Sequence, residues 1–204
     1  MSEAGGREFI LRARKAPTSP VFSLDDLARA GHLEIVAHCV ANALFISGQI
    51  RPAIAVHLVL EGAPAPPRTI RLESDTLCSL GGFDERSICQ LVQQALKVGR
   101  DLKLGEELRV DSGVYIAKRS FEQLVREKST AAPLYYLQPR GEDIRAVEFS
   151  LPAAFVFSDH LSMPKKTDKY LARLGARPLS VGPRRLFASQ CIVLVHNELD
   201  RQRR

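Results

Sequence analysis

The sequence predicts an α/β fold in which short buried strands alternate with crossover helices around one sheet. Apolar residues make up 45% of the 204 residues and are spread along the whole chain. Segments with strand-like alternation and segments with helical spacing follow one another, without an internal repeat or a low-complexity tract. Because this length is at the upper end of what one domain usually holds, we expect a single domain over residues 1–204.

The first predicted elements are a strand, a helix and a hairpin. Residues Arg7–Arg14 alternate apolar and polar side chains, as in a half-buried strand. Ser23 precedes an acidic pair, which predicts the start of a helix, and apolar residues then recur at helical spacing from Leu33 to Gly48. Residues Ile54–Leu60 and Thr69–Leu72 are β-rich and flank a turn of glycine and prolines, so they predict a hairpin.

Two further helices begin with capping signals. Asp84 is placed to cap a helix that ends at Gly99. Ser120 and Gln123 form a capping box for another helix, and residues Val114–Ala117 predict a short strand before it.

The last third contains three short apolar strands, a helix between the last two, and a final helix. The strands are residues Tyr135–Leu137, Ala154–Phe157 and Pro178–Val181, and the helices are residues Lys166–Leu174 and Phe187–Asp200. Because the apolar face of the final helix is wider than one chain needs to cover, we expect an obligate homodimer. The residues on which this expectation depends are Phe187, Ile192, Val195 and Leu199.

Several classes of protein are excluded by what the sequence lacks. No apolar run reaches the roughly 18 residues of a membrane span, and the start of the chain has no apolar signal core, so we expect a soluble, cytoplasmic protein. None of the four cysteines forms a C-x-x-C motif with another. This spacing favours buried thiols over a metal site or disulfides. Phosphate-binding glycine loops and the common hydrolase motifs are also absent.

The net charge of +6 suggests an anionic partner, and its distribution is more informative than its size. Basic residues concentrate near the two ends of the chain. If those ends meet in space, they could form one phosphate-facing surface. The residues expected to flank a binding site are Arg12, Arg14, Lys165, Lys166, Arg184 and Arg185.

The only histidine beside a carboxylate is His160, which follows Asp159 directly after a buried strand. Ligand-binding loops of parallel sheets lie at such strand ends. The alternative is a turn in which Asp159 caps the next segment.

The surrounding sequence resembles the archaeal tRNA (pseudouridine-N1-)-methyltransferase family of the TrmY type, within the SPOUT superfamily. The resemblance covers nearly the whole chain, from Arg7-Glu8-Phe9 to His196-Asn197-Glu198-Leu199-Asp200. Its more specific landmarks are Ser23-Leu24-Asp25-Asp26-Leu27, Asp84-Glu85-Arg86, Tyr135-Tyr136-Leu137, Gly141-Glu142-Asp143, Ser158-Asp159-His160, and Cys191-Ile192 leading into His196-Asn197.

This resemblance implies a SPOUT-like open, mostly parallel sheet with flanking helices and a C-terminal deep trefoil knot, an exception to the general absence of knots. The knot, at about residues 133–204, would bind S-adenosylmethionine mainly through backbone groups of three loops, in a homodimer whose active site lies between the subunits. The loop Ser180–Pro183 suits such a site because small residues and proline fix its backbone. The cofactor-binding residues carried over from the family are Leu137, Ser158, Asp159, His160, Leu179, Ser180, Val181, Gly182, Pro183, Leu186 and Cys191.

The chain departs from the archaeal pattern in its knot loops. Archaeal members are expected to have one glycine at the position of Ser158 and another near Ser162, although a serine still offers its backbone amide. Residues Met163–Thr167 and Leu186–Cys191 look closer to the bacterial branch. Bacterial tRNAs usually lack the pseudouridine that the archaeal enzyme modifies, so the RNA substrate stays open.

Methylation of a pseudouridine requires removal of a weakly acidic N–H proton and stabilisation of the resulting anion. The family landmarks suggest Asp25 or Asp84 as the base and Arg7 or Arg86 as the cation; the alternative for each is a local structural role. Three functions follow: a tRNA pseudouridine N1-methyltransferase, a SPOUT methyltransferase of another RNA such as rRNA, or an RNA-binding relative without catalysis. No metal is expected to take part.

Overall fold

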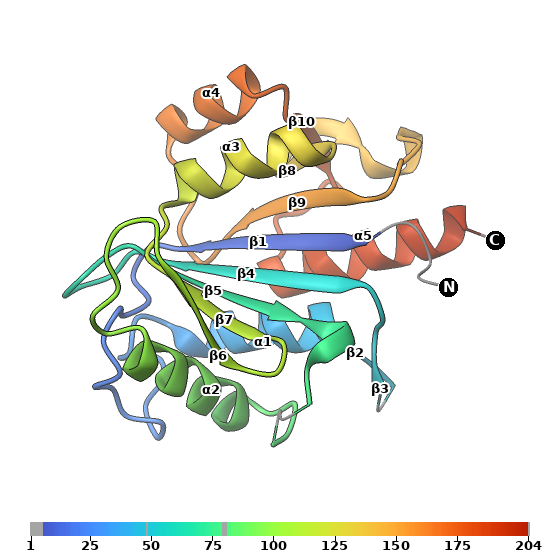
Figure 1. Cartoon of the computed structure of the whole chain (residues 1–204). Helices are drawn as coiled ribbons and strands as arrows, with labels where there is room; N and C mark the ends of the chain where they lie inside the picture. Colours follow the sequence, from blue (N-terminus) through green and yellow to red (C-terminus); the bar gives the residue numbers. More distant parts are fainter. Residues whose placement is uncertain (1–5, 48, 79–80, 204) are drawn as a thin grey trace.

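The computed structural model describes residues 6–47, 49–78 and 81–203. Within these residues, one eight-stranded sheet has the strand order β10-β8-β9-β1-β4-β5-β7-β6 (Figure 1). Its parallel part is β1 (Arg7–Ala13), β4 (Ile54–Leu60), β8 (Leu134–Asp143), β9 (Ala153–Ser158) and β10 (Arg177–Ser180). An antiparallel extension follows from β5 (Arg68–Glu73), β7 (Val114–Ala117) and β6 (Glu107–Asp111). The predicted open, mostly parallel sheet is therefore confirmed.

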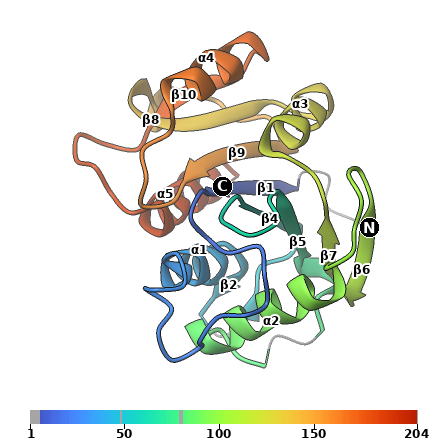
Figure 2. The same cartoon turned by 90° about the vertical axis from the view of Figure 1, so that its left-hand side faces the viewer.

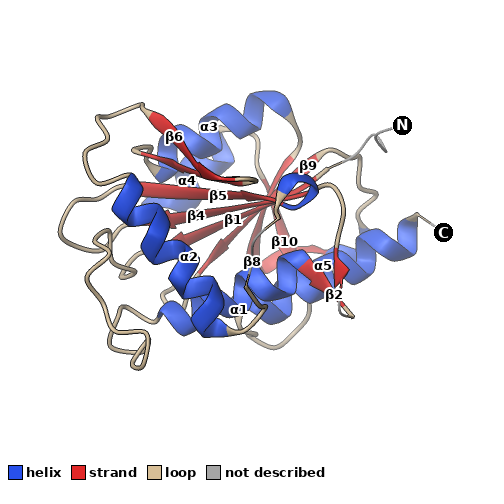
Figure 3. Cartoon of the chain, turned by 60° about the horizontal axis from the view of Figure 1, so that its bottom comes forward, coloured by secondary structure: helices blue, strands red, loops and turns tan. Residues whose placement is uncertain are grey.

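Helices cover both faces of the sheet (Figure 2). One face carries α1 (Leu33–Leu44), α2 (Glu85–Val98) and α5 (Ala188–Gln202), which lie on the near side in Figure 3. The other face carries α3 (Phe121–Ala131) and α4 (Lys165–Arg173). Each face has its own buried core because side chains alternate along a strand. In β1, Phe9 and Leu11 enter the first core, whereas Ile10 enters the second.

Smaller elements connect these layers. They are the two-stranded hairpin of β2 (Phe45–Ile46) and β3 (Gln49–Ile50), and the short 3-10 helices η1 (Ser74–Thr76) and η2 (Ile144–Ala146).

The capping predictions and the hairpin are confirmed. The Asp84 carboxylate accepts a hydrogen bond from the Ser87 amide at the start of α2. Ser120 and Gln123 form both hydrogen bonds of the capping box on α3. Strands β4 and β5 pair in the predicted antiparallel arrangement.

The predicted helix start at Ser23 is wrong. The Ser23 hydroxyl accepts a hydrogen bond from the Asp25 amide in a turn, and the chain enters a helix only at Leu33. Just before it, Gly31 has φ +70°, and a Cβ there would lie 2.1 Å from the Lys15 carbonyl oxygen. Both Gly31 and the N-cap His32 have a positive φ, which is not helical, so the residues before them cannot continue into α1 as one helix. Helix α1 also ends earlier than predicted, at Leu44, and Gly48 lies outside the described residues.

The apolar face of α5 is covered within the same chain, contrary to the argument made for a dimer. Ile192, Val195 and Leu199 are at most 2% exposed and belong to the core that α5 shares with α1. Phe187, just before the helix, is 66% exposed. The width of this face therefore reflects packing on the sheet and on α1, and it gives no support to a subunit contact.

The cysteines are free thiols: Cys39, Cys89 and Cys191 are buried and Cys78 is exposed. Burial raises the pKa of Cys89 to about 12 and raises the pKa of Cys39 as well. Among the described residues, no group of three or more His, Cys, Asp or Glu side chains could hold a metal ion. None of the helices in the described ranges has the length and apolar character needed to cross a membrane.

Candidate cofactor-binding site

A cavity of about 540 Å³ lies where β8, β9 and β10 give way to loops, next to the start of α5. Its size is within the range of small-molecule sites, and it lies at the carboxyl edge of the parallel strands, where such sites are expected. All of the cofactor residues predicted from the sequence line it except Pro183: Leu137, Ser158, Asp159, His160, Leu179, Ser180, Val181, Gly182, Leu186 and Cys191.

An irregularity in the pairing of β8 with β10 forms one wall of the cavity. Tyr136 pairs with Pro178, but the next residue of β10, Leu179, pairs with Glu142. The segment 137–141 of β8 therefore leaves the ladder, and Leu137 lines the cavity. Gly141 permits this geometry, because a Cβ at that position would lie 2.5 Å from the backbone of Leu179.

The loop after β9 is held by the carboxylate of Asp159. Its two oxygens accept hydrogen bonds from the amides of Arg14 (3.0 Å) and Leu161 (2.9 Å), and its side chain is 2% exposed. The exposed part of Asp159 is therefore its main chain. The neighbouring ring of His160 packs on that of His32, with 4.2 Å between the centroids. This loop offers the cavity backbone groups in a fixed position, as the predicted recognition of adenine requires.

The loop after β10 contains a backbone conformation that glycine adopts easily and other residues do not. Gly182 has φ +143°, a conformation that residues with a side chain rarely adopt. Leu179 and Leu186 add apolar surface, and burial raises the pKa of the Cys191 thiol, which keeps it protonated. Apolar side chains on the cavity walls, with fixed backbone groups at the rim, fit the uncharged adenine of S-adenosylmethionine.

Asp168 of α4 also lines this cavity, and the sequence interpretation did not single it out. Burial raises the pKa of its carboxyl group. The signal available in the sequence was an acidic residue among lysines, directly after a predicted ligand-binding loop.

Arg12 does not face RNA as predicted, because its guanidinium is compensated inside the protein. It forms two hydrogen bonds with Glu61 (3.0 and 2.9 Å), an ion pair with Glu122 (3.3 Å) and a hydrogen bond to the Thr167 hydroxyl (2.8 Å). It also lies over the ring of Phe121. Arg12 thus links β1 to α3 and to the first turn of α4.

The other predicted RNA-facing cations are exposed near the cavity. Arg184 and Arg185 line it, and Lys165 and Lys166 begin α4. Arg14 is tied to the same loop through its backbone. In the part of the chain that the structure describes, none of these five side chains forms an ion pair. Arg203, in contrast, lies just after α5 and lines a small cavity with Arg7, Arg51 and Asp200 at the start of β1.

The four catalytic candidates lie outside the cavity. Arg86 and Asp25 form an exposed ion pair of 2.6 Å at the start of α2. Hydrogen bonds from Ser87, first of all from its hydroxyl, lower the pKa of the nearby Asp84 carboxylate. Arg7 is the first residue of β1, so it lies at the opposite end of the strand from the cavity. The structure therefore brings Asp25, Asp84 and Arg86 to one region and separates Arg7 from them.

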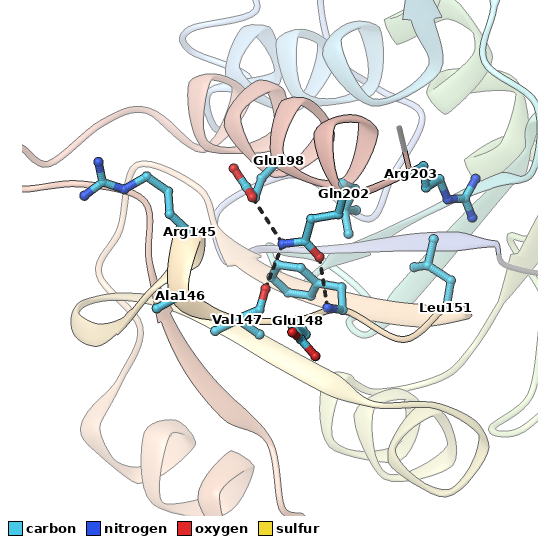
Figure 4. A pocket seen from close by; sticks show the side chains of 10 residues that line it. Arg145, Ala146, Val147, Glu148, Leu151, Glu198, Gln202 and Arg203 are labelled. Atoms are coloured by element: carbon cyan, nitrogen blue, oxygen red, sulfur yellow. Dashed lines mark hydrogen bonds between the residues drawn. The ribbon is translucent and has the colours of Figure 1, made fainter.

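A second cavity, of about 720 Å³, lies between η2, the loop before β9 and the end of α5 (Figure 4). The Gln202 amide donates to the Val147 carbonyl (2.8 Å) and to Glu198 (3.1 Å), and its oxygen accepts from the Phe149 amide (3.1 Å). These contacts attach α5 to the loop. Although this cavity is larger, it lies away from the carboxyl ends of the strands and contains none of the predicted site residues.

Comparisons with known proteins identify the family of the chain. The family described as "Putative SAM-dependent RNA methyltransferase" matches residues 6–204. A "Putative pseudouridine methyltransferase" of Photobacterium profundum is 40% identical over 194 residues, which are 95% of this chain and 98% of that protein. One of Vibrio vulnificus, with the same name, is 40% identical over 196 residues, covering 96% and 99%.

The fold has a counterpart among solved structures. The crystal structure of Archaeoglobus fulgidus Nep1 bound to S-adenosylhomocysteine superposes with a TM-score of 0.61 and 12% identity, covering 98% of this chain and 99% of that one. At this identity the likeness concerns the fold alone. The family match over nearly the full length and the 40% identity to curated relatives go further: the chain belongs to the family of SAM-dependent RNA methyltransferases.

Proposed function

We propose that the protein transfers the methyl group of S-adenosylmethionine to N1 of a pseudouridine in RNA, with tRNA as the substrate. The observation that carries this proposal is the cavity at the carboxyl ends of the parallel strands. Its loops present backbone groups to the cavity, and exposed cations flank it. The names of the relatives from Photobacterium and Vibrio support pseudouridine as the target. We further propose that the enzyme is a cytoplasmic homodimer and that its chain forms a trefoil knot at about residues 133–204.

The cofactor supplies an electrophilic methyl group on a sulfonium. The protein must bind it, exclude water and hold the target nitrogen in line with the methyl carbon. The segment 137–141 of β8 and the loops after β9 and β10 would serve the first two tasks. Lys165, Lys166, Arg184 and Arg185 would contact RNA phosphates and bring the nucleotide to the cavity mouth.

The catalytic candidates outside the cavity fit this proposal only through a dimer. In an active site built between subunits, the exposed Asp25–Arg86 pair and Asp84 of one subunit would face the cavity of the other. Arg7 is buried at the opposite edge of the sheet, and we therefore assign it to stability rather than to the reaction.

Three tRNA transcripts that differ at one nucleotide would test the function. One carries pseudouridine, one uridine and one 1-methylpseudouridine at the same position, and each is incubated with S-adenosylmethionine before digestion and mass spectrometry of the nucleosides. We expect 1-methylpseudouridine to form only in the first, because only that substrate has a free N1–H on a C-glycosidic ring. Methylation of a ribose, or of an rRNA transcript in preference to tRNA in a parallel incubation, would identify another SPOUT activity. Binding of RNA without methylation of any substrate would identify a non-catalytic relative.

A further inference from the structure

Asp168 is the carboxylate of the cavity wall whose oxygens have no partner in the described part of the chain. The other cavity carboxylate, Asp159, accepts two backbone hydrogen bonds and is 2% exposed, so its oxygens are not available to a substrate. We propose that Asp168 accepts the N1 proton of the target pseudouridine, an inference that rests on the proposed function.

The position of Asp168 is held by its neighbour in the sequence. Thr167 is buried, and its hydroxyl accepts a hydrogen bond of 2.8 Å from Arg12. Arg12 is itself fixed by Glu61 on the β4 side and by Glu122 on α3. The first turn of α4 is therefore attached to the central strand β1. Arg14, directly after β1, donates its amide hydrogen to Asp159 and so attaches the loop after β9 to the same strand. These attachments would hold the base in a fixed position relative to the cofactor loop.

The surroundings of Asp168 favour a proton acceptor. Burial raises the pKa of its carboxyl group toward the range where a general base is effective. Tyr136 of β8 lies close by: burial, and after it the negative charge of Asp168, raise the pKa of the phenol. The other ionisable side chains that line the cavity are Asp159, His160, Arg184, Arg185 and Cys191. Of these, the thiol of Cys191 stays protonated and the arginines carry no removable proton at neutral pH.

The step balances without a further reactant. The N1–H bond breaks and its proton passes to an oxygen of Asp168. The electron pair left on N1 forms a bond to the methyl carbon, while the pair of the methyl–sulfur bond returns to sulfur. The products are 1-methylpseudouridine, S-adenosylhomocysteine and a protonated Asp168, which then loses its proton to water.

The test compares Asp168→Asn with wild type and with Asp101→Asn. Asp101 is exposed on the turn after α2, so its replacement is the same chemical change away from the cavity. Three quantities are measured: affinity for S-adenosylhomocysteine by calorimetry, the single-turnover methylation rate on pseudouridine-containing tRNA at saturating cofactor, and the dependence of that rate on pH.

For Asp168→Asn we expect a rate at least a hundredfold lower at neutral pH, with cofactor affinity within about twofold of wild type, because a general base contributes about 10²–10⁴-fold. The difference from wild type should narrow as the pH rises, since N1–H then ionises in solution and needs no base. Asp101→Asn should match wild type in all three measurements.

Two results would overturn the role of Asp168 while leaving the proposed function intact. A tenfold loss of cofactor affinity with an unchanged rate at saturation would make Asp168 a cofactor ligand. A lower rate whose pH profile runs parallel to that of wild type would make it a structural residue. If wild type itself methylates no pseudouridine, the proposed function fails, and the assignment of Asp168 fails with it.

Discussion

The parallel strands begin at one side of the sheet, here called the amino edge, and end at the other, the carboxyl edge. Both edges contain the same kinds of charged residue, but the two sets differ in whether they form ion pairs. At the amino edge, the buried Arg7 donates to Asp200 (2.6 Å) and to Nδ1 of His196 (2.8 Å), and Arg51 donates to the other oxygen of Asp200 (3.0 Å). At the carboxyl edge, Arg12 is compensated in the same way, but Arg14 and the cations around the cavity are exposed and form no ion pair in the described residues.

This difference follows from how the strands end. At the amino edge, the end of α5 lies over the start of β1 and supplies the partners that a buried guanidinium needs. At the carboxyl edge, β8 leaves the ladder at residues 137–141 and β9 and β10 end in loops, which leaves a cavity and exposes the charges beside it. We therefore expect changes at the amino edge to alter stability, and changes at the carboxyl edge to alter ligand binding.

The largest expected effect is on stability, from Arg7→Met. It leaves His196 without its donor and Asp200, which is 39% exposed, with Arg51 as its remaining partner. We therefore expect the free energy of unfolding to fall by about 3 kcal/mol, the lower end of the cost of breaking a buried pair. Denaturation in urea measures this change. Arg126→Met, at an exposed position on α3, should alter the free energy by less than about 0.5 kcal/mol. An unchanged stability with loss of methyl transfer would instead return Arg7 to the active site.

The second prediction concerns the cofactor loop. Gly182→Val requires a valine at φ +143°, so the loop must leave its path. We expect affinity for S-adenosylmethionine to fall at least a hundredfold, about 2.7 kcal/mol. The matched control is Gly105→Val, since Gly105 also has a positive φ (+86°) and open space around it but lies outside the cavity. Equal losses in the two variants would mean that backbone strain alone, and not the cavity, weakens binding.

Most of the helices and strands could be predicted because their signals are local. Alternation in β1, the Asp84 cap and the Ser120 capping box each depend on residues a few positions apart. Strand β6 was missed because it is an edge strand whose first three residues are exposed, so it has no apolar alternation. The family resemblance located the loops around the cavity, which no local pattern would have brought together.

The partners of each charge could not be predicted, because they come from distant parts of the chain. Arg7 and Asp200 are 193 residues apart, and Arg12 and Thr167 are 155 apart. Arg12 and Arg14 look alike in the sequence, yet one is buried in ion pairs and the other is exposed. Asp168 was overlooked for the same reason, since only the packing of α4 places it in the cavity wall.

The amino edge should also make stability depend on pH. His196 accepts from Arg7 at Nδ1, so its Nε2–H donates to the Ala43 carbonyl, and the ring is neutral. Burial, with the positive charges of Arg51 and Arg7, lowers the pKa of His196 to about 3. The unfolded chain binds a proton below its ordinary value of about 6.5. Stability is therefore full above that pH and falls as the pH drops toward 3, by about 2 kcal/mol at pH 5.

Urea denaturation at pH 7.5, 6 and 5 measures this loss, and His196→Gln is the comparison. Glutamine can still accept and donate one hydrogen bond but does not titrate in this range. It should lower stability at neutral pH and flatten the dependence between pH 7.5 and 5. An equally steep dependence in the variant would assign the effect to other groups, such as the buried His57, whose pKa burial also lowers.

At the carboxyl edge, the exposed lysines should contribute to RNA affinity. Changing Lys165 and Lys166 together to glutamate should weaken tRNA binding at least tenfold, about 1.4 kcal/mol, and reduce its salt dependence, while S-adenosylmethionine affinity stays the same. The control with an equal change of charge is Lys97→Glu with Lys103→Glu, two exposed positions on the α2 side. Loss of both affinities in the Lys165 and Lys166 variant would place these lysines in the cofactor site or in the stability of α4.

The last prediction has the smallest expected effect on stability. It tests whether the Asp25–Arg86 ion pair contributes to stability or to methyl transfer. Both side chains are more than half exposed, at 81% and 56%, so the ion pair is screened by water and Arg86→Ala should change the free energy of unfolding by less than about 1 kcal/mol. Such a variant remains folded, which makes its activity informative. If one subunit presents Arg86 to the cavity of the other, methyl transfer at saturating RNA should fall at least tenfold, with cofactor affinity unchanged. Asp26→Asn removes a neighbouring carboxylate that pairs with Arg29 instead, and it should leave the rate unchanged. If the rate of Arg86→Ala equals that of wild type, the pair is only a surface contact between the turn and α2, and the active site is confined to the carboxyl edge of a single subunit.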